Sequence, residues 1–267
     1  MDFLLIFKSI IMGLVEGATE FLPISSTGHL IIAADLLNFL SLEKRNVFEI
    51  IIQLGAILAV CFEFRNRLIN TASNMTKEAS AMGFILNLMI AFLPAAILGL
   101  LFHKAIKLYL FSPITVAFAL IVGGFVILII EKFAPQANTN RIEAISHKQA
   151  LQIGLAQSLA LMPGVSRAGA TILGGMVFGL NRQIATEFSF FLAIPIMFAA
   201  TGYDLLKNYK LLDINDAGIF LAGFITAFLS ALLVIKILIK FVANHNFNSF
   251  AWYRIIFGSI VLAYYWH

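Results

Sequence analysis

Long apolar runs separated by short polar segments cover most of the chain. Six runs of about 20 residues, the length of a membrane-spanning helix, occupy residues 47–64, 82–102, 114–130, 184–203, 217–239 and 250–265. The short alternating segments typical of a transmembrane barrel do not occur in the sequence. The pattern therefore predicts an all-α integral membrane protein.

Two further apolar stretches are interrupted and too short to span a bilayer twice. Residues 3–22 form a candidate helix that stops at Pro23, residues 25–28 form a turn, and residues 29–39 form a short helix. Residues 149–162 and 168–180 form a second pair, broken at Pro163 and Gly164. A helix, a broken loop and a short helix predict a re-entrant hairpin in each case.

The two hairpins resemble each other in sequence. Gly13-Leu14 matches Gly154-Leu155, Glu16 matches Gln157, and residues 25–28 match residues 166–169. Each hairpin is followed by three apolar runs, and because three is odd the second half must lie inverted. We therefore expect a single membrane domain, residues 1–267, with repeats at 1–133 and 149–267 and a polar linker at 134–148. Interrupted helices at corresponding places in inverted repeats indicate a site within the membrane.

Composition agrees with this fold class. Hydrophobic residues make up 61% of the chain and charged residues 12%, with a net charge of +4, which excludes an ordinary soluble protein. The small positive charge suits anionic lipid headgroups and gives no indication of nucleic-acid binding. Asp2 stands where a signal peptide would carry a basic residue, so we expect the first apolar run to be retained. A single cysteine, Cys61, allows no intrachain disulfide.

Loop charges predict the orientation. One set of loops carries Arg65, Arg67, Lys77, Lys132, Arg141, Lys148, Arg182 and Lys240, and the other carries Lys44, Arg45, Lys104, Lys107, Lys207 and Lys210. Because basic loops favour the cytoplasm, the first set is placed there, and both termini are then outside.

The first broken loop gathers groups suited to phosphate chemistry. Glu16 and Glu20 are four residues apart, so a helix places both carboxylates on one face, with no Lys or Arg within four residues of either. A divalent cation, Mg²⁺ or Ca²⁺, would relieve their repulsion, and Mg²⁺ typically also binds substrate phosphates. Ser25, Ser26 and Thr27 either cap the next helix or bind an anion at its start, and His29 is a candidate acid or base.

The second broken loop supplies a cation. Arg167 follows the break between two short apolar helices, and its planar fork suits two phosphate oxygens. Gly164, Ser166 and Thr171 add hydrogen-bond donors for a substrate. The alternative role for Arg167 is a structural bond to backbone carbonyls or to Glu187.

These motifs together resemble a known family. The run from Glu16 to His29, Glu-Gly-x-Thr-Glu-Phe-Leu-Pro-x-Ser-Ser-Thr-Gly-His, is similar to the signature of the undecaprenyl-diphosphate phosphatases, also known as bacitracin-resistance proteins. Pro163-Gly164-Val165-Ser166-Arg167 with Thr171 resembles the second signature of the family, except that Ala168 replaces its serine.

The resemblance implies hydrolysis of undecaprenyl diphosphate to undecaprenyl phosphate and phosphate, with metal dependence. It also implies recycling of the lipid carrier for peptidoglycan synthesis and cell-wall biogenesis, bacitracin resistance, and a place in the bacterial inner membrane with the active site facing outward. The family's catalytic groups correspond to Glu20, Ser26, His29 and Arg167, and its metal site to Glu16 and Glu20.

Several alternatives stay open at this stage. A secondary transporter or flippase of a polyprenyl phosphate would share inverted repeats and broken helices. The nucleophile is Ser26, His29 or a water activated by the metal, and a homodimer is compatible with the sequence. The type-2 phosphatidate phosphatase mechanism is rejected, because it needs a second histidine shortly after Ser166-Arg167 and none lies between His147 and His245.

Overall fold

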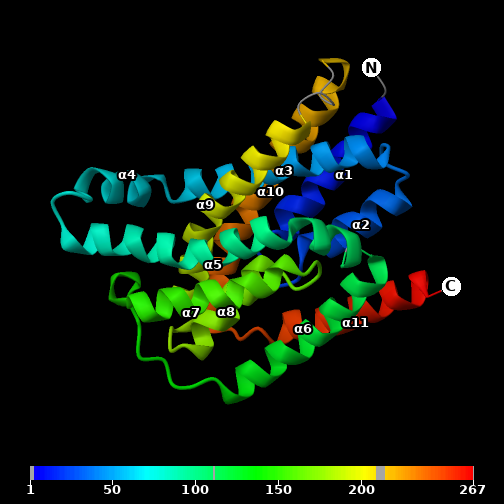
Figure 1. Cartoon of the computed structure of the whole chain (residues 1–267). Helices are drawn as coiled ribbons and strands as arrows, with labels where there is room; N and C mark the ends of the chain where they lie inside the picture. The colour runs from blue at the N-terminus through cyan, green and yellow to red at the C-terminus, as the bar shows by residue number, and fades with distance from the viewer. Residues whose placement is uncertain (1–2, 111, 209–213, 267) are drawn as a thin grey trace.

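The protein is all-helical. The computed structural model describes residues 3–110, 112–208 and 214–266, in which there are eleven α-helices and no sheet (Figure 1). The helices are α1 Phe3–Thr19, α2 Ser26–Leu36, α3 Leu42–Glu63, α4 Arg65–Asn74, α5 Ala79–Tyr109, α6 Pro113–Phe133, α7 His147–Ser158, α8 Arg167–Val177, α9 Arg182–Asn208, α10 Ala217–Asn244 and α11 Asn248–Tyr265. Asp2, Lys210 and the side chains of Lys104 and Lys107 lie outside the described residues.

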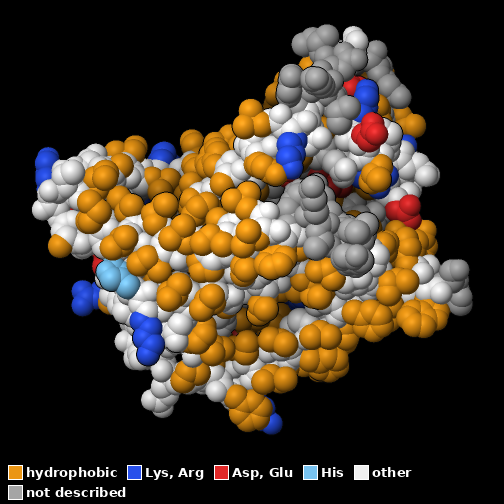
Figure 2. All heavy atoms as spheres, in the orientation of Figure 1, with side chains coloured by type: hydrophobic (Ala, Val, Ile, Leu, Met, Phe, Trp, Pro, Cys, Tyr) orange, Lys and Arg blue, Asp and Glu red, His pale blue; other side chains and the backbone are white. Residues whose placement is uncertain are grey.

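Five of the described helices are long and apolar enough to cross a membrane. They are α3, α6, α9, α10 and the segment Ala79–Phe102 of α5. The sixth expected run, 250–265, forms α11, which is not among these five because it begins with polar residues and carries Arg254. Figure 2 shows hydrophobic side chains over much of the visible face, with Lys and Arg mostly toward its edges, as a membrane protein requires.

Each interrupted stretch folds as two helices joined by a short loop. The helix α1 ends at Thr19, three residues before the predicted end at residue 22. Its last helical hydrogen bond runs from Glu20 N to Glu16 O, and the chain turns between there and Pro23. The helix α7 continues through the 3-10 turn Leu159–Leu161 before its loop. The helices α2 and α8, which follow the loops, are both 11 residues long. We call residues 20–25 the first loop and residues 162–166 the second loop.

Close helix packing brings the two loops together. Gly13 of α1 lies against α10, where an added Cβ would sit 3.1 Å from Ala227 N. Gly154 of α7 lies against α5, where a Cβ would sit 2.5 Å from Ala91 O. Small residues allow such approaches between membrane helices. The helix α7 also contacts α8, and α6 packs along α11, so the broken stretches are held by helices on both sides.

Candidate active site

A small polar cavity lies where the two loops meet. Its volume is about 170 Å³, and its lining comes from both loops, from the starts of α2 and α8, and from α3. The lining residues are Glu20, Ser25, Ser26, Thr27, Gln53, Ala160, Met162, Pro163, Gly164, Ser166 and Arg167. Groups far apart in the sequence therefore share one polar space inside an apolar protein.

A carboxylate links the candidate nucleophile to the cation. The Oε2 atom of Glu20 accepts a hydrogen bond from Ser26 Oγ, and its Oε1 atom accepts one from Arg167 Nη2 at 3.0 Å. All three side chains are largely withdrawn from solvent, with exposed fractions of 7% for the Glu20 side chain and 13% for the Arg167 side chain. Charged groups in such a setting interact strongly, so the three residues act as one unit.

The remaining contacts of Arg167 fix its plane. Its Nη1 atom donates to Ser189 O at 3.2 Å, Nη2 also contacts Met197 Sδ at 3.3 Å, and the guanidinium lies 5.5 Å from the centre of the Phe21 ring. Its Nε atom is buried and has no hydrogen-bond partner among the described residues. An unpaired buried donor beside a cavity is available to an anionic ligand.

The second loop is tied to the first and shaped by a glycine. Ser166 Oγ donates to Leu22 O at 3.4 Å and accepts a bond from Gly169 N at 3.0 Å, capping α8. Gly164 has a φ of +92°, and a Cβ there would lie 2.7 Å from Val116 O of α6. Both the conformation and the close approach require glycine at this position.

Thr171 lies one helical turn inside α8 rather than on the cavity. Its hydroxyl donates toward the carbonyls of Arg167 and Ala168 and shares a 2.5 Å hydrogen bond with Ser189 Oγ. It supports the same segment of α9 that Arg167 contacts. Ala168 is fully buried in the apolar core, so a serine hydroxyl at that position would not belong to the cavity lining.

Both ring nitrogens of His29 contact groups other than the Ser26 hydroxyl. Its Nδ1 atom lies 2.7 Å from Ser25 O and its Nε2 atom 2.6 Å from the hydroxyl of Tyr253, while its ring stacks on Phe257 at 4.3 Å. Because a carbonyl oxygen can only accept, Nδ1 carries a proton, and in the neutral ring Nε2 accepts from Tyr253. This arrangement makes His29 a support for the backbone at Ser25.

Two buried residues at corresponding places have unsatisfied oxygens. Glu16 is 1% exposed and Gln157 is 2% exposed, and neither Oε1 atom has a hydrogen-bond partner among the described residues. Glu16 lies close enough to Glu20 and Arg167 for their charges to interact with it. No group of three or more His, Cys, Asp or Glu side chains among the described residues could hold a metal ion. A cation here would need ligands from the substrate.

Sequence reasoning missed three residues of this region. Gln53 of α3 lines the cavity, and Ser189 and Met197 of α9 contact Arg167. Gln53 is an amide inside the apolar run 47–64, which is a usable signal. The other two have no signal in the sequence, because their approach depends on how α8 packs against α9.

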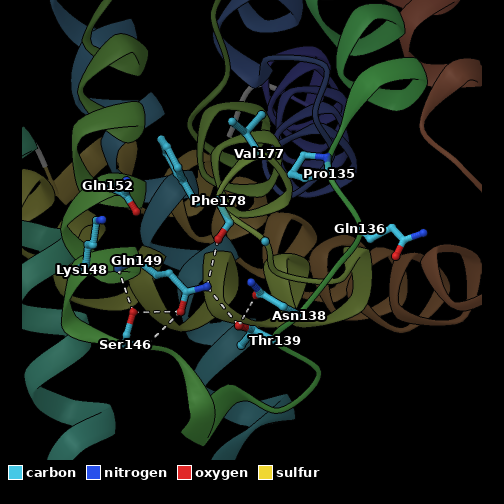
Figure 3. Close-up of a pocket in the computed structure, with 11 residues that line it drawn as sticks. Pro135, Gln136, Asn138, Thr139, Ser146, Lys148, Gln149, Gln152, Val177 and Phe178 are labelled. Carbon is cyan, nitrogen blue, oxygen red and sulfur yellow. Dashed lines mark hydrogen bonds between the residues drawn. The ribbon is translucent and has the colours of Figure 1, made fainter.

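Two other cavities differ in character. One, of about 590 Å³, lies between the linker and α7 (Figure 3), where Gln149 bonds Ser146, Thr139 Oγ1 and Phe178 O. Lys148 is the charged residue in its described lining, so it lacks the paired charges of the polar cavity. The other is an apolar groove of about 950 Å³ between α5, α6 and α8, which shares Met162 with the polar cavity.

Comparison with known proteins agrees with these observations. The family described as "Bacitracin resistance protein BacA" matches residues 9–260. A protein of Methylobacillus flagellatus is 63% identical over the whole of both chains. One of Laribacter hongkongensis is 58% identical over 100% of this chain and 97% of its own, and one of Neisseria gonorrhoeae 53% over 98% and 96%. All three are named undecaprenyl-diphosphatase.

Proposed function

The chain belongs to the family of the bacitracin resistance protein BacA, and we infer that it is an undecaprenyl-diphosphatase. It hydrolyses undecaprenyl diphosphate to undecaprenyl phosphate and phosphate, which serves peptidoglycan synthesis and confers bacitracin resistance. The Ser26–Glu20–Arg167 unit is the observation that links this activity to the polar cavity. The apolar groove beside it suits a polyprenyl chain.

The geometry supports attack by Ser26. As its Oγ atom bonds to the terminal phosphorus, its proton passes to Glu20 Oε2, and the bond from that phosphorus to the bridging oxygen breaks. Undecaprenyl phosphate leaves with the electron pair of that bond. Water then attacks the phosphoserine, the bond from phosphorus to Ser26 Oγ breaks, Ser26 recovers its proton from Glu20, and the oxygen and both protons of the water leave with phosphate.

Arg167 stabilises the charge that develops on the transferring group. Its Nε atom is unpaired among the described residues and can donate to a phosphoryl oxygen, while its Nη2 atom is held by Glu20 and Met197. Donors fixed in place before reaction need no reorganisation in the transition state. Ser25, Thr27, Gly164 and Ser166 complete the binding surface for the diphosphate, and Thr171 holds Arg167 in place through Ser189.

A divalent cation, Mg²⁺ or Ca²⁺, fits beside Glu16 and Glu20. The buried, unpartnered Oε1 of Glu16 gives it a free ligand atom, and the charge of Glu20 lies nearby. Such a cation neutralises diphosphate charge when bound. Glu16 would be its main protein ligand, because both oxygens of Glu20 are already hydrogen-bonded.

Neutralising either carboxylate should therefore weaken metal use. Glu16→Gln is expected to raise the Mg²⁺ concentration for half-maximal activity by about tenfold or more, because one carboxylate ligand is lost. Glu20→Gln should also lower kcat at saturating Mg²⁺, because it removes the proton acceptor. Electron paramagnetic resonance of Mn²⁺, added together with the product undecaprenyl phosphate to supply phosphate ligands, gives the affinity without turnover. Glu63→Gln, which affects a surface pair with Lys236, is the control, and unchanged Mn²⁺ affinity in Glu16→Gln would exclude the proposed ligand.

Inverted repeats account for the paired features of the two hairpins. Ser25 and Ser166 occupy matching positions and both have left-handed backbone, with φ of 69° and 76°. Gly13 and Gly154 pack against α10 and α5, which are matching spans of the two halves. Glu16 and Gln157 match as buried residues with unsatisfied oxygens. These parallels support two repeats, 1–133 and 149–267, each with a re-entrant hairpin.

The site should open to the outer side of the bacterial inner membrane. In Figure 1 the start of α1 and the end of α11 lie toward one end of the molecule and α4 lies at the other, which agrees with the expected orientation, in which the basic segment of Arg65 and Arg67 is cytoplasmic. Ser41, at the start of α3, is exposed, whereas Asn38 has a φ of 47° that disfavours other residues.

Cysteine labelling tests this orientation. In a Cys61→Ser background, Ser41→Cys should react with an impermeant maleimide in intact spheroplasts, and Ser73→Cys, exposed on α4, only after lysis. The fraction of labelled protein is read by mass shift. The reverse pattern would place the site on the cytoplasmic side.

Phosphate release tests the activity itself. The purified protein in detergent should release phosphate from undecaprenyl diphosphate with Mg²⁺ present. A transporter or flippase of a polyprenyl phosphate would release none.

A further inference from the structure

Arg254 of α11 is a buried cation whose hydrogen bonds all go to the backbone. The residue is 1% exposed, and its five N–H groups meet five carbonyl oxygens. Nε donates to Leu120 O at 3.2 Å, Nη1 to Pro23 O and Val165 O at 3.0 Å each, and Nη2 to Ala119 O at 3.0 Å and Gly164 O at 2.9 Å. No carboxylate is among the hydrogen-bond partners described for it.

These five carbonyls belong to three separate parts of the fold. Pro23 lies in the first loop, Gly164 and Val165 lie in the second loop, and Ala119 and Leu120 lie in α6. One side chain thus connects both broken hairpins to each other and to a long membrane helix. In hydrocarbon surroundings, carbonyls that loops leave free must find donors inside the protein, and here a single planar fork supplies them.

The bonds fall next to the strained positions of the site. Val165 directly precedes Ser166, and Pro23 precedes Ser25 by two residues. Ser25 and Ser166 have positive φ, which non-glycine residues adopt only where the surroundings impose it. Ser26 and Arg167, the next residues in each chain segment, are the reacting serine and the cation. Fixing the carbonyls before the strained serines therefore fixes the direction of both functional side chains.

We propose that Arg254 is a positioning residue for the phosphatase reaction, which holds the two loops in the register that brings Ser26 to Arg167. The proposal rests on the proposed function of these two residues. Lysine cannot replace Arg254, because it keeps the charge but offers three N–H donors from one atom where five carbonyls need a planar fork.

Neighbouring glycines on α6 offer a matched test. A Cβ on Gly123 would overlap the guanidinium of Arg254, whereas a Cβ on Gly124 would meet Ile255 Cγ1 at 2.6 Å and Ala251 O at 2.7 Å. Both substitutions crowd the contact between α6 and α11, but Gly123→Ala alone displaces Arg254. The measurements are kcat, KM for undecaprenyl diphosphate and Tm in detergent.

Gly123→Ala and Arg254→Lys should each lower kcat about 100-fold, since misplacing reacting groups by about 1 Å has this effect. KM should change much less than kcat, because the diphosphate can still bind the same donors when the two loops are less firmly fixed. Gly124→Ala should keep kcat within about threefold of wild type, even if its Tm falls by as much as the Tm of Gly123→Ala. The double variant Gly123→Ala/Arg254→Lys should be little worse than either single variant, because both changes remove the same fixation.

Two outcomes would overturn the proposal. If Gly123→Ala and Gly124→Ala lose kcat equally, in step with Tm, Arg254 contributes only to packing. If Arg254→Lys folds and keeps normal kcat, the fork is not required. A wild-type protein that released no phosphate would instead refute the proposed function, so the two failures are distinguishable.

Discussion

Ser26→Ala is expected to reduce phosphate release by about 10⁴-fold or more, because removing a covalent nucleophile leaves only binding and charge stabilisation. In the wild type, rapid acid quench with substrate labelled in the terminal phosphate should trap label on Ser26. Glu20→Gln should trap almost none, because Glu20 is the group that receives the Ser26 proton. Both single-turnover label and steady-state phosphate are measured.

The controls separate this result from general damage. Ser259→Ala removes a hydroxyl of α11 that bonds Ile255 O, and it should keep wild-type rates. His29→Ala should still form labelled Ser26, because both ring nitrogens contact groups other than Ser26. Label that is trapped by an alkaline quench, is labile to acid and is lost in His29→Ala would make the histidine the nucleophile. Full activity in Ser26→Ala would exclude the serine.

Arg167→Lys is expected to lose about 10³-fold in kcat, nearly as much as Arg167→Ala. Lysine can keep the ion pair with Glu20, but it has no second nitrogen that could donate to a phosphoryl oxygen as the unpaired Nε atom of Arg167 can. Positive charges aimed at a transferring phosphoryl group contribute effects of this size. Steady-state kinetics with saturating Mg²⁺ gives the comparison.

Arg182→Lys is the matched control for this change. Arg182 forms a forked pair with Glu131, through Nε at 3.1 Å and Nη2 at 2.6 Å, and lies outside the polar cavity. It should lose thermal stability while keeping kcat near that of wild type. A nearly normal Arg167→Lys would make Arg167 a structural charge whose role is to hold Glu20.

The sequence predicts most of the membrane helices, because apolar runs are long and loops are polar. The helix α4 was not expected, since Arg65–Asn74 is short and polar and none of its described residues is buried. The helix α5 extends to Ala79 and Tyr109, beyond the apolar run 82–102, because polar helix ends outside hydrocarbon carry no hydropathy signal. The helical structure of such segments depends on contacts with neighbouring helices, which the hydropathy pattern does not reveal.

The candidate site was likewise predicted only in part from the sequence. Short-range spacing and the repeat match place Glu20, Ser26 and Arg167 in one region, and the structure brings these three together. The orientation of His29 could not be predicted, because it depends on Tyr253 and Phe257 of α11. The role of Arg254 was overlooked although a cation inside an apolar run is itself a signal; its five partners are backbone atoms, which sequence does not reveal.

The interleaving of the two halves also constrains how the protein is made. The helix α1 packs on α10 and α6 packs on α11, so the N-terminal half lacks its main partners while it emerges from the ribosome. Its carboxylates, Glu16 and Glu20, enter the bilayer before Arg167 has been synthesised. Completion of the fold must therefore wait until the end of translation, when α11 inserts and brings Arg254 to the loops. A truncated nascent chain would contain the serine and both acids yet have no working centre.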